Sequence, residues 1–164
     1  MIILVNKLGM LRFKNHYFRC GLGKNGITNN KKEGDYKTPK GIFNIKNIMY
    51  RKDRIKNIKT KIPKIIIKKN HICCDIPSNP NYNKIFKTND ISIGERLWRK
   101  DSLYDILVVL DYNLNPIIKN KGSAIFLHLI DKRFSPTKGC IAIRKKDFIK
   151  ILPLVTKRTK LFIY

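Results

Sequence analysis

Apolar positions in this chain form short runs or alternate with polar ones, and stretches rich in Asn, Lys, Gly and Pro separate them. Short runs and alternation are typical of β-strands, whereas a helix needs apolar residues three or four positions apart over a longer stretch. The pattern predicts strands at residues 1–5, 10–13, 18–22, 42–48, 65–67, 106–110, 123–130 and 161–164, the first two joined as a hairpin.

One run marks the centre of the predicted sheet. Ile106 to Leu110 is apolar at every position, which is expected of a strand that is buried on both faces. Residues 111–116 then turn the chain, so residues 123–130 are expected to pair with this strand in antiparallel fashion. The alternation in strand 18–22 places Cys20 on the buried face, as a small core residue.

The pattern leaves little room for helix. A short helix is expected near the C-terminus, with its N-cap at Asp147, its stop at Pro153, and Phe148, Ile151 and Leu152 on one face. Residues 51–61 are expected to be a weak helix or a solvated loop, and residues 70–87 a long irregular excursion. Residues 1–164 are therefore predicted to form one mainly β domain, a β-rich α+β fold with one or two short helices.

Candidate chemistry lies in residues 125–143, which read as strand, polar loop, strand. His128 lies near the end of the first strand, and Cys140 opens the second. If these strands pair side by side, the imidazole comes within reach of the thiol, as a cysteine nucleophile requires. Gly139 permits a sharp turn that directs successive backbone N–H groups at a developing oxyanion.

The residues before the thiol strengthen this interpretation. Thr137 and Lys138 supply a hydroxyl and a cation, and a nearby cation lowers the pKa of a thiol and enriches the thiolate. Thr137 is expected either to hydrogen-bond across the loop or simply to cap the turn.

The other cysteines indicate neither a metal site nor a disulfide framework. Cysteines at positions 20, 73, 74 and 140 form no C-x-x-C pair, and His71 with Cys73 and Cys74 lacks a fourth ligand at a usual spacing. No metal is therefore expected.

The formal net charge is +25, from 36 Lys and Arg against 11 Asp and Glu. Such a charge suggests an anionic partner, but the basic residues form no tract interleaved with stacking aromatics, so nucleic acid is not the expected partner. Residues 1–7 contain neither a basic segment nor a long apolar one, so a signal peptide or membrane span is not expected. The oligomeric state is left open.

The segment from Thr137 to Cys140, with His128 upstream, resembles the motif of the L,D-transpeptidase catalytic domain, the YkuD-type family. In that family a His on a strand is followed, after a variable loop, by Ser or Thr, His, Gly and Cys. Residues 34–43 resemble the family's Thr-Pro-x-Gly-x-Phe segment. Residues 95–104 and 122–128 resemble a bacterial branch with a short His-to-Cys loop, so the resemblance covers nearly the whole chain.

The resemblance implies a twisted β-sandwich and a set of roles. Cys140 would be the nucleophile, His128 the base, the Leu129 carbonyl the group that orients the imidazole, and the N–H groups of Gly139 and Cys140 the oxyanion hole. The family's reaction is acyl transfer on peptidoglycan tetrapeptide stems with loss of the terminal D-Ala. An amine then gives a 3→3 cross-link, or water gives L,D-carboxypeptidase hydrolysis. The resemblance implies no cofactor.

Two departures from the family pattern concern substrate binding. Lys138 stands where the family has His, and Ala142 stands where it has Asn or Arg, a polar contact that Arg144 is expected to supply. Trp98 and Tyr104 are candidates for a wall of the cleft, although core packing is the favoured interpretation of both.

Three alternatives stay open from the sequence. The chain is an L,D-transpeptidase or L,D-carboxypeptidase, a catalytically degenerate relative that binds cell wall, or a basic nucleic-acid binder. The family acts in the periplasm or cell wall, and with no leader visible three possibilities stay open: a cytoplasmic location, export by an unusual route, or a leader that is not among the residues given.

Overall fold

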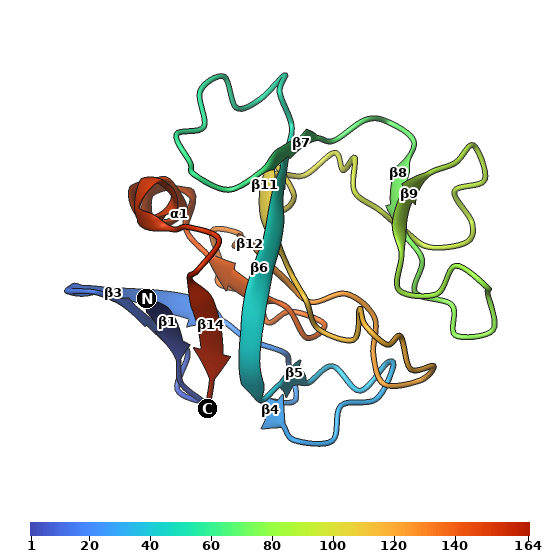
Figure 1. The fold of residues 1–164 in the computed structure, drawn as a ribbon, viewed down its shortest axis with the longest axis horizontal. Coiled ribbons are helices and arrows are strands. Elements are labelled where there is room, and N and C mark those ends of the chain that lie inside the picture. The colour runs from blue at the N-terminus through green and yellow to red at the C-terminus, as the bar shows by residue number, and fades with distance from the viewer.

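A computed structural model describes residues 1–164, and most of its strands belong to one nine-stranded sheet (Figure 1). The strand order is β11-β12-β13-β3-β2-β1-β14-β6-β7, and β11 also pairs with β6. The sheet therefore closes on itself and is barrel-like, and the mainly β fold class is confirmed. Its strands are β1 (Ile2–Val5), β2 (Met10–Phe13), β3 (His16–Gly21), β6 (Gly41–Tyr50), β7 (Lys64–Ile66), β11 (Ile106–Leu110), β12 (Phe126–Leu129), β13 (Ile141–Ile143) and β14 (Lys160–Ile163).

Alternation along these strands builds the core inside the closed sheet. On β1 and β2, Ile3, Val5, Leu11 and Phe13 are all buried, while the residues between them are more exposed. They belong to a core of 24 buried side chains drawn from all parts of the sheet. The predicted hairpin of β1 and β2 is confirmed, and so is the burial of Cys20 on β3.

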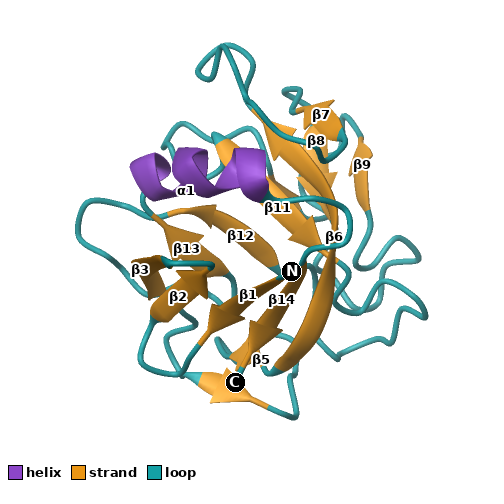
Figure 2. Cartoon of the chain, turned by 60° about the vertical axis from the view of Figure 1, so that its left-hand side comes forward, coloured by secondary structure: helices purple, strands orange, loops and turns teal.

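One α-helix, α1 (Lys145–Ile151), lies across the end of the sheet near β12 and β13 (Figure 2). Its buried residues, Phe148 and Ile151, belong to the same core. The predicted N-cap is wrong: Arg144 is the N-cap, and Asp147 lies in the first turn, where a carboxylate favours the positive end of the helix dipole. The α-helix ends at Ile151, two residues before Pro153, and a short 3-10 helix follows over Leu152–Leu154.

The stretch predicted to be irregular contains a second, smaller sheet. Its order is β10-β8-β9, formed by β8 (His71–Cys73), β9 (Ile85–Lys87) and β10 (Glu95–Arg96). A second core of eight buried residues joins this small sheet to β11 and β12. Cys73, Leu97 and Tyr104 are among its members. Two short parallel strands, β4 (Ile27–Thr28) and β5 (Thr38–Pro39), complete the strands, and residues 51–61 contain no helix.

The predicted central strand is the element on which the site is built. All five residues of β11 are buried, and β11 pairs antiparallel with both β12 and β6. On its other side β12 pairs with β13 in parallel, with Leu127 opposite Ile141 and His128 opposite Ala142. The pairing of β12 with β13 thus brings His128 and Cys140, which directly precedes Ile141, to the same side of the sheet.

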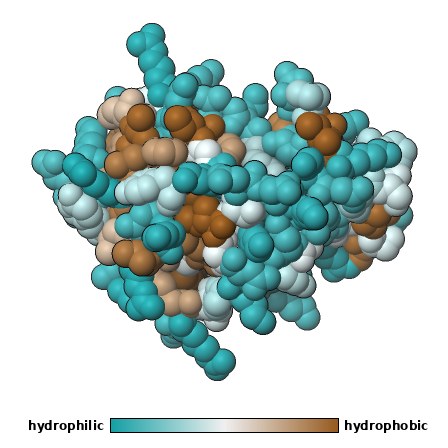
Figure 3. Space-filling model, turned by 90° about the horizontal axis from the view of Figure 1, so that it is seen from below, coloured by the Kyte–Doolittle hydropathy of each residue, from teal (hydrophilic) through white to brown (hydrophobic).

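The surface agrees with the composition. In the space-filling view from below, hydrophilic side chains cover most of the face and apolar ones lie in separate patches (Figure 3). No helix in the structure combines the length and apolar character that crossing a bilayer needs.

Candidate active site

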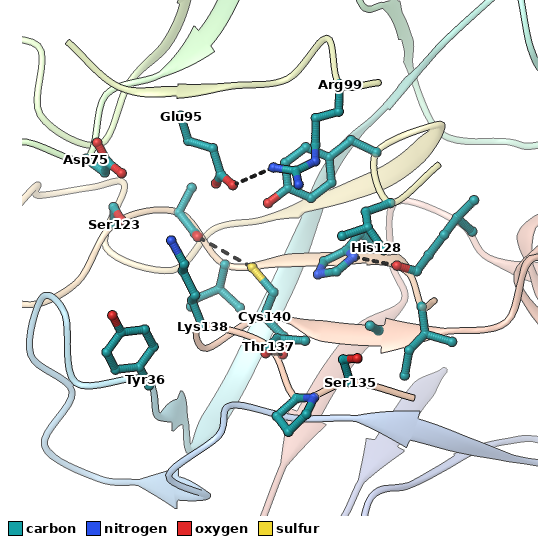
Figure 4. A pocket seen from close by; sticks show the side chains of 18 of the residues that line it. Tyr36, Asp75, Glu95, Arg99, Ser123, His128, Ser135, Thr137, Lys138 and Cys140 are labelled. Atoms are coloured by element: carbon teal, nitrogen blue, oxygen red, sulfur yellow. Dashed lines mark hydrogen bonds and ion pairs between the residues drawn. The ribbon is translucent and has the colours of Figure 1, made fainter. Parts of the chain in front are cut away.

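A cavity of about 440 Å³ lies where β12, the loop before β13, and the segments around residues 31–36 and 95–104 meet (Figure 4). It brings together six of the residues singled out in the sequence, namely His128, Leu129, Thr137, Lys138, Cys140 and Tyr104. Gly139 is buried between two of them. The cavity carries both signs of charge close to a thiol and an imidazole.

His128 is held as a neutral imidazole. Its Nδ1 lies 2.7 Å from the carbonyl oxygen of Leu129, the hydrogen bond that the family resemblance implies. An Nδ1–H that donates to this carbonyl leaves Nε2 with its lone pair, as a base requires. The Tyr104 ring packs edge-on against the imidazole with centroids 5.2 Å apart. Burial lowers the pKa of His128 to about 4, so the ring carries no charge at neutral pH.

Cys140 directly precedes β13, and its thiol is held by the backbone of β12. The Phe126 N–H donates to Sγ at 3.3 Å, and Sγ lies 4.0 Å from the carbonyl oxygen of Ala124. No hydrogen bond joins Sγ to His128, although both side chains line the same cavity. The thiol and imidazole are therefore neighbours in the cavity but are not hydrogen-bonded to each other.

The electrostatics of the thiol differ from the prediction. Burial, with a smaller contribution from Glu95, raises the pKa of Cys140 to about 12, whereas the sequence predicted a pKa lowered by Lys138. That prediction is wrong because the loss of hydration outweighs the nearby favourable groups, and the exposed Lys138 is not among the groups that shift this pKa. The cation that opposes the shift is Lys31, which lowers the pKa of the thiol through space.

Thr137 makes hydrogen bonds within the loop of residues 137–140. Its Oγ1 donates to the carbonyl oxygen of Cys140 at 2.6 Å and accepts from the Gly139 N–H at 3.1 Å. Of the two N–H groups expected in the oxyanion hole, that of Gly139 is therefore engaged. The N–H of Cys140 has no partner within the protein.

The Thr38-Pro39 segment packs beside the loop of residues 137–140. Thr38 is fully buried, and its Oγ1 accepts the Gly23 N–H at 2.8 Å. Gly139 has a φ of +137°, and a Cβ there would lie only 2.8 Å from the carbonyl oxygen of Lys37. Glycine is needed at this position because the segment approaches so closely.

Several charged residues of the cavity were missed by sequence reasoning. Glu33 accepts hydrogen bonds from the Tyr82 hydroxyl at 2.6 Å and from Ser123 Oγ at 3.2 Å. Nη1 of Arg99 lies 3.4 Å from Oε1 of Glu95, and burial raises the pKa of Glu95. The additional charged lining residues are Lys31, Glu33, Asp75, Glu95, Arg99 and Asp131. Glu33 adjoins the segment that resembles the family motif, a signal that would have found it.

Two predicted substrate-binding residues do not line the cavity. The Arg51 guanidinium lies over the Trp98 ring, 3.4 Å from its centroid, and the partly buried Trp98 packs against the second core. Arg144 lies beyond the end of β13, at the start of α1, with its guanidinium 4.7 Å from the Phe134 ring centroid. It cannot replace the polar contact missing at Ala142, because the strand face on which it was placed ends at Ile143.

The His71 and Cys73 pair serves the small sheet instead. Both lie on β8, and His71 Nδ1 accepts the Lys68 N–H at 2.8 Å. No group of three or more His, Cys, Asp or Glu side chains in the structure is arranged to hold a metal ion.

Comparisons with known proteins show which family the sequence resembles. The sequence profile of the L,D-transpeptidase catalytic domain, YkuD, matches residues 2–163. No curated protein shows significant similarity to the chain. The solved structure of Bdellovibrio bacteriovorus Bd1075 is similar, with 15% sequence identity and a TM-score of 0.48. That match covers 99% of this chain and 47% of the other, so the chain spans about half the length of Bd1075.

Proposed function

The chain belongs to the L,D-transpeptidase catalytic domain (YkuD) family, which acts on peptidoglycan, and from this premise we propose that it catalyses cysteine-dependent acyl transfer on tetrapeptide stems. The observation that carries the proposal is the joint placement of Cys140 and His128 in one cavity, with the imidazole oriented by the Leu129 carbonyl. A general base next to a nucleophile, itself oriented by a third group, is the arrangement that covalent acyl transfer requires.

The first half of the reaction uses these groups in turn. Sγ of Cys140 attacks the carbonyl carbon of the third stem residue, and Nε2 of His128 accepts the thiol proton. The carbonyl oxygen becomes an oxyanion, to which the free Cys140 N–H donates. The tetrahedral intermediate then collapses, the peptide bond to the terminal D-Ala breaks, and the departing amine takes the proton from His128.

The second half decides the product. An amine from a neighbouring stem attacks the thioester carbon, transfers its proton to His128 and releases the thiol, which gives a 3→3 cross-link. Water in place of the amine gives L,D-carboxypeptidase hydrolysis. The cavity suits a zwitterionic peptide because Lys31, Lys138 and Arg99 can meet carboxylates, while Glu33 and Glu95 can meet an ammonium group.

A second candidate is a catalytically degenerate relative that binds cell wall without turnover. Two observations favour it: the thiol and imidazole form no hydrogen bond, and the pKa of the thiol is raised rather than lowered. Catalytic hydrogen bonds often tighten only in the substrate complex, so the active enzyme remains our proposal.

Cys140→Ala separates the two candidates. With a tetrapeptide stem, the wild type is expected to release D-Ala and the variant to release none, because no other thiol lines the cavity. The same pair is treated with a carbapenem, a β-lactam that acylates thiols, and analysed by intact mass. The wild type is expected to gain one adduct. Cys20, Cys73 and Cys74 remain in the variant and serve as the internal control.

Undiminished D-Ala release by the variant would refute the proposed nucleophile. If the wild type released no D-Ala and formed no carbapenem adduct but still bound isolated peptidoglycan, the degenerate relative would be established instead.

A further inference from the structure

Lys31 is a buried cation in a chain whose many other basic residues are mostly solvated. Its exposed fraction is 6%, and it lines the cavity together with Cys140. Lysine is almost never buried to this extent without a reason, since removing an ammonium from water is costly. The proposed function gives this residue no role beyond contact with a substrate carboxylate.

The surrounding backbone makes a place for the Lys31 side chain. A Cβ on Gly122 would lie 2.9 Å from Lys31 Cγ, and a Cβ on Gly139 would lie 3.5 Å from Lys31 Cε. The stem of the lysine therefore runs past two glycines, one of which directly precedes the nucleophile. Its ammonium group belongs to the surroundings of the Gly139-Cys140 peptide.

The ammonium is anchored on one side only. Nζ donates to Asp35 Oδ1 at 2.5 Å and to the Lys32 carbonyl oxygen at 2.9 Å, and its third N–H has no partner in the protein. Asp35 also accepts the backbone N–H groups of Lys32 and Lys37, at 2.8 Å each, so its carboxylate is shared among three donors. The ion pair with Asp35 holds the Lys31 side chain in place. The third N–H of its ammonium stays free to interact with negative charge that develops nearby.

Such charge arises beside it during acyl transfer. Negative charge develops on Sγ as the proton leaves and on the carbonyl oxygen as the thiol attacks. The Gly139 N–H is already bound by Thr137, which leaves the Cys140 N–H as the free backbone donor. Of the charged groups that act on the thiol, Glu95 opposes ionisation and Lys31 favours it.

We propose that Lys31 is the charge-compensating residue of this site, whose buried ammonium stabilises the negative charge on Cys140 and on the adjoining oxyanion. The residue moves no proton: the thiol proton goes to His128 as before, and Lys31 stays an ammonium throughout. This inference rests on the proposed function for its role in turnover, but its effect on the thiol exists without any substrate.

The test measures the thiol directly. Cys140 is alkylated with iodoacetamide, which is uncharged, and the rate is followed by mass mapping over a pH series in the wild type, Lys31→Met and Asp35→Asn. Methionine removes the charge and keeps a similar length, so alkylation at a given pH is expected to slow by about tenfold. Asp35→Asn keeps the lysine and removes its counter-charge, so alkylation is expected to become faster.

Lys32→Met is the matched control, because this neighbouring lysine is exposed and only its backbone contacts Lys31. Its alkylation profile is expected to equal that of the wild type. Thermal unfolding of each variant reports whether the fold is retained. D-Ala release by Lys31→Met is expected to fall by about tenfold or more, as when an oxyanion-stabilising group is lost.

Opposite changes in Lys31→Met and Asp35→Asn support the proposal even if no peptidoglycan activity is found, because alkylation needs no substrate. If Lys31→Met does not fold, the acceleration in Asp35→Asn alone decides the question. Equal alkylation profiles in the folded variants and the wild type would overturn it.

Discussion

The resting protonation state of the cysteine and histidine pair is the most direct consequence of the site's burial. The pKa of Cys140 is raised to about 12 and that of His128 is lowered to about 4, each chiefly by burial. The two pKa values differ by about 8 units, so at about 1.36 kcal/mol per unit the proton transfer costs on the order of 10 kcal/mol before the attraction between thiolate and imidazolium is counted. The free protein should therefore hold a neutral thiol beside a neutral imidazole.

This gap bears on the timing of proton transfer. A turnover of about 10 s⁻¹ corresponds to a barrier of about 16 kcal/mol, and ionising the pair in advance would use most of it. We expect the proton to move to His128 as Sγ bonds to the carbonyl carbon, in an enclosed cavity where substrate has displaced water. The groups that face the pair are Glu95 and Lys31 at the thiol, and Arg99 and Asp101 at the imidazole.

Two measurements check the neutral resting pair. The ultraviolet absorbance of a thiolate, taken as the difference between wild type and Cys140→Ala, should be absent at neutral pH. The logarithm of the Cys140 alkylation rate should rise steadily from about pH 6 to about pH 9 with no plateau, because the thiol titrates above this range. A thiolate signal at neutral pH, or a plateau that disappears in His128→Gln, would refute the reasoning.

Two further predictions concern stability. Burial lowers the pKa of His128 from 6.5 to about 4 in the folded state, so the unfolded chain binds the proton at a higher pH than the folded chain does. The free energy of unfolding should therefore fall by about 3 kcal/mol as the pH drops from about 6.5 to about 4. Urea unfolding at several pH values should show this loss in the wild type and not in His128→Gln, and equal losses would contradict it. Gly139→Ala should cost about 1–3 kcal/mol and most D-Ala release, because it combines a positive φ with a Cβ contact to the Lys37 carbonyl. Gly26→Ala, with a φ of +79° and nothing nearby, is its control for strain alone, and equal thermal unfolding of the two would show that the contact does not matter.

Local pattern was sufficient for the strands that carry the site. The apolar run at β11 and the order of His128, loop and Cys140 can be read from residues that are close in the sequence. The structure has the strands that they predict, β11, β12 and β13, side by side. The small sheet of β8 and β9 was missed because its pairing joins segments separated by a Pro- and Asn-rich loop, and nothing local distinguishes that loop from an irregular excursion.

Burial was the property that the sequence did not reveal. Lys31 is one of 36 basic residues, and its ion pair with Asp35 and the packing of glycines 122 and 139 around it distinguish it from the solvated ones. For the same reason the sequence predicted a lowered thiol pKa from the adjacent Lys138. The direction is set by burial of the thiol, and its contacts with the backbone of Ala124 and Phe126 form only when the chain folds.

The parallel pairing of β1 with β14 joins residues 2–5 to residues 160–163. During synthesis on a ribosome, the first strand of this ring leaves the exit tunnel long before its partner exists. Until β14 emerges, β1 and β6 each present an unsatisfied edge to the cytosol, where they can pair with a foreign strand or recruit a chaperone. A ribosome stalled while residues 160–163 are still inside the tunnel should therefore display a protease-sensitive chain.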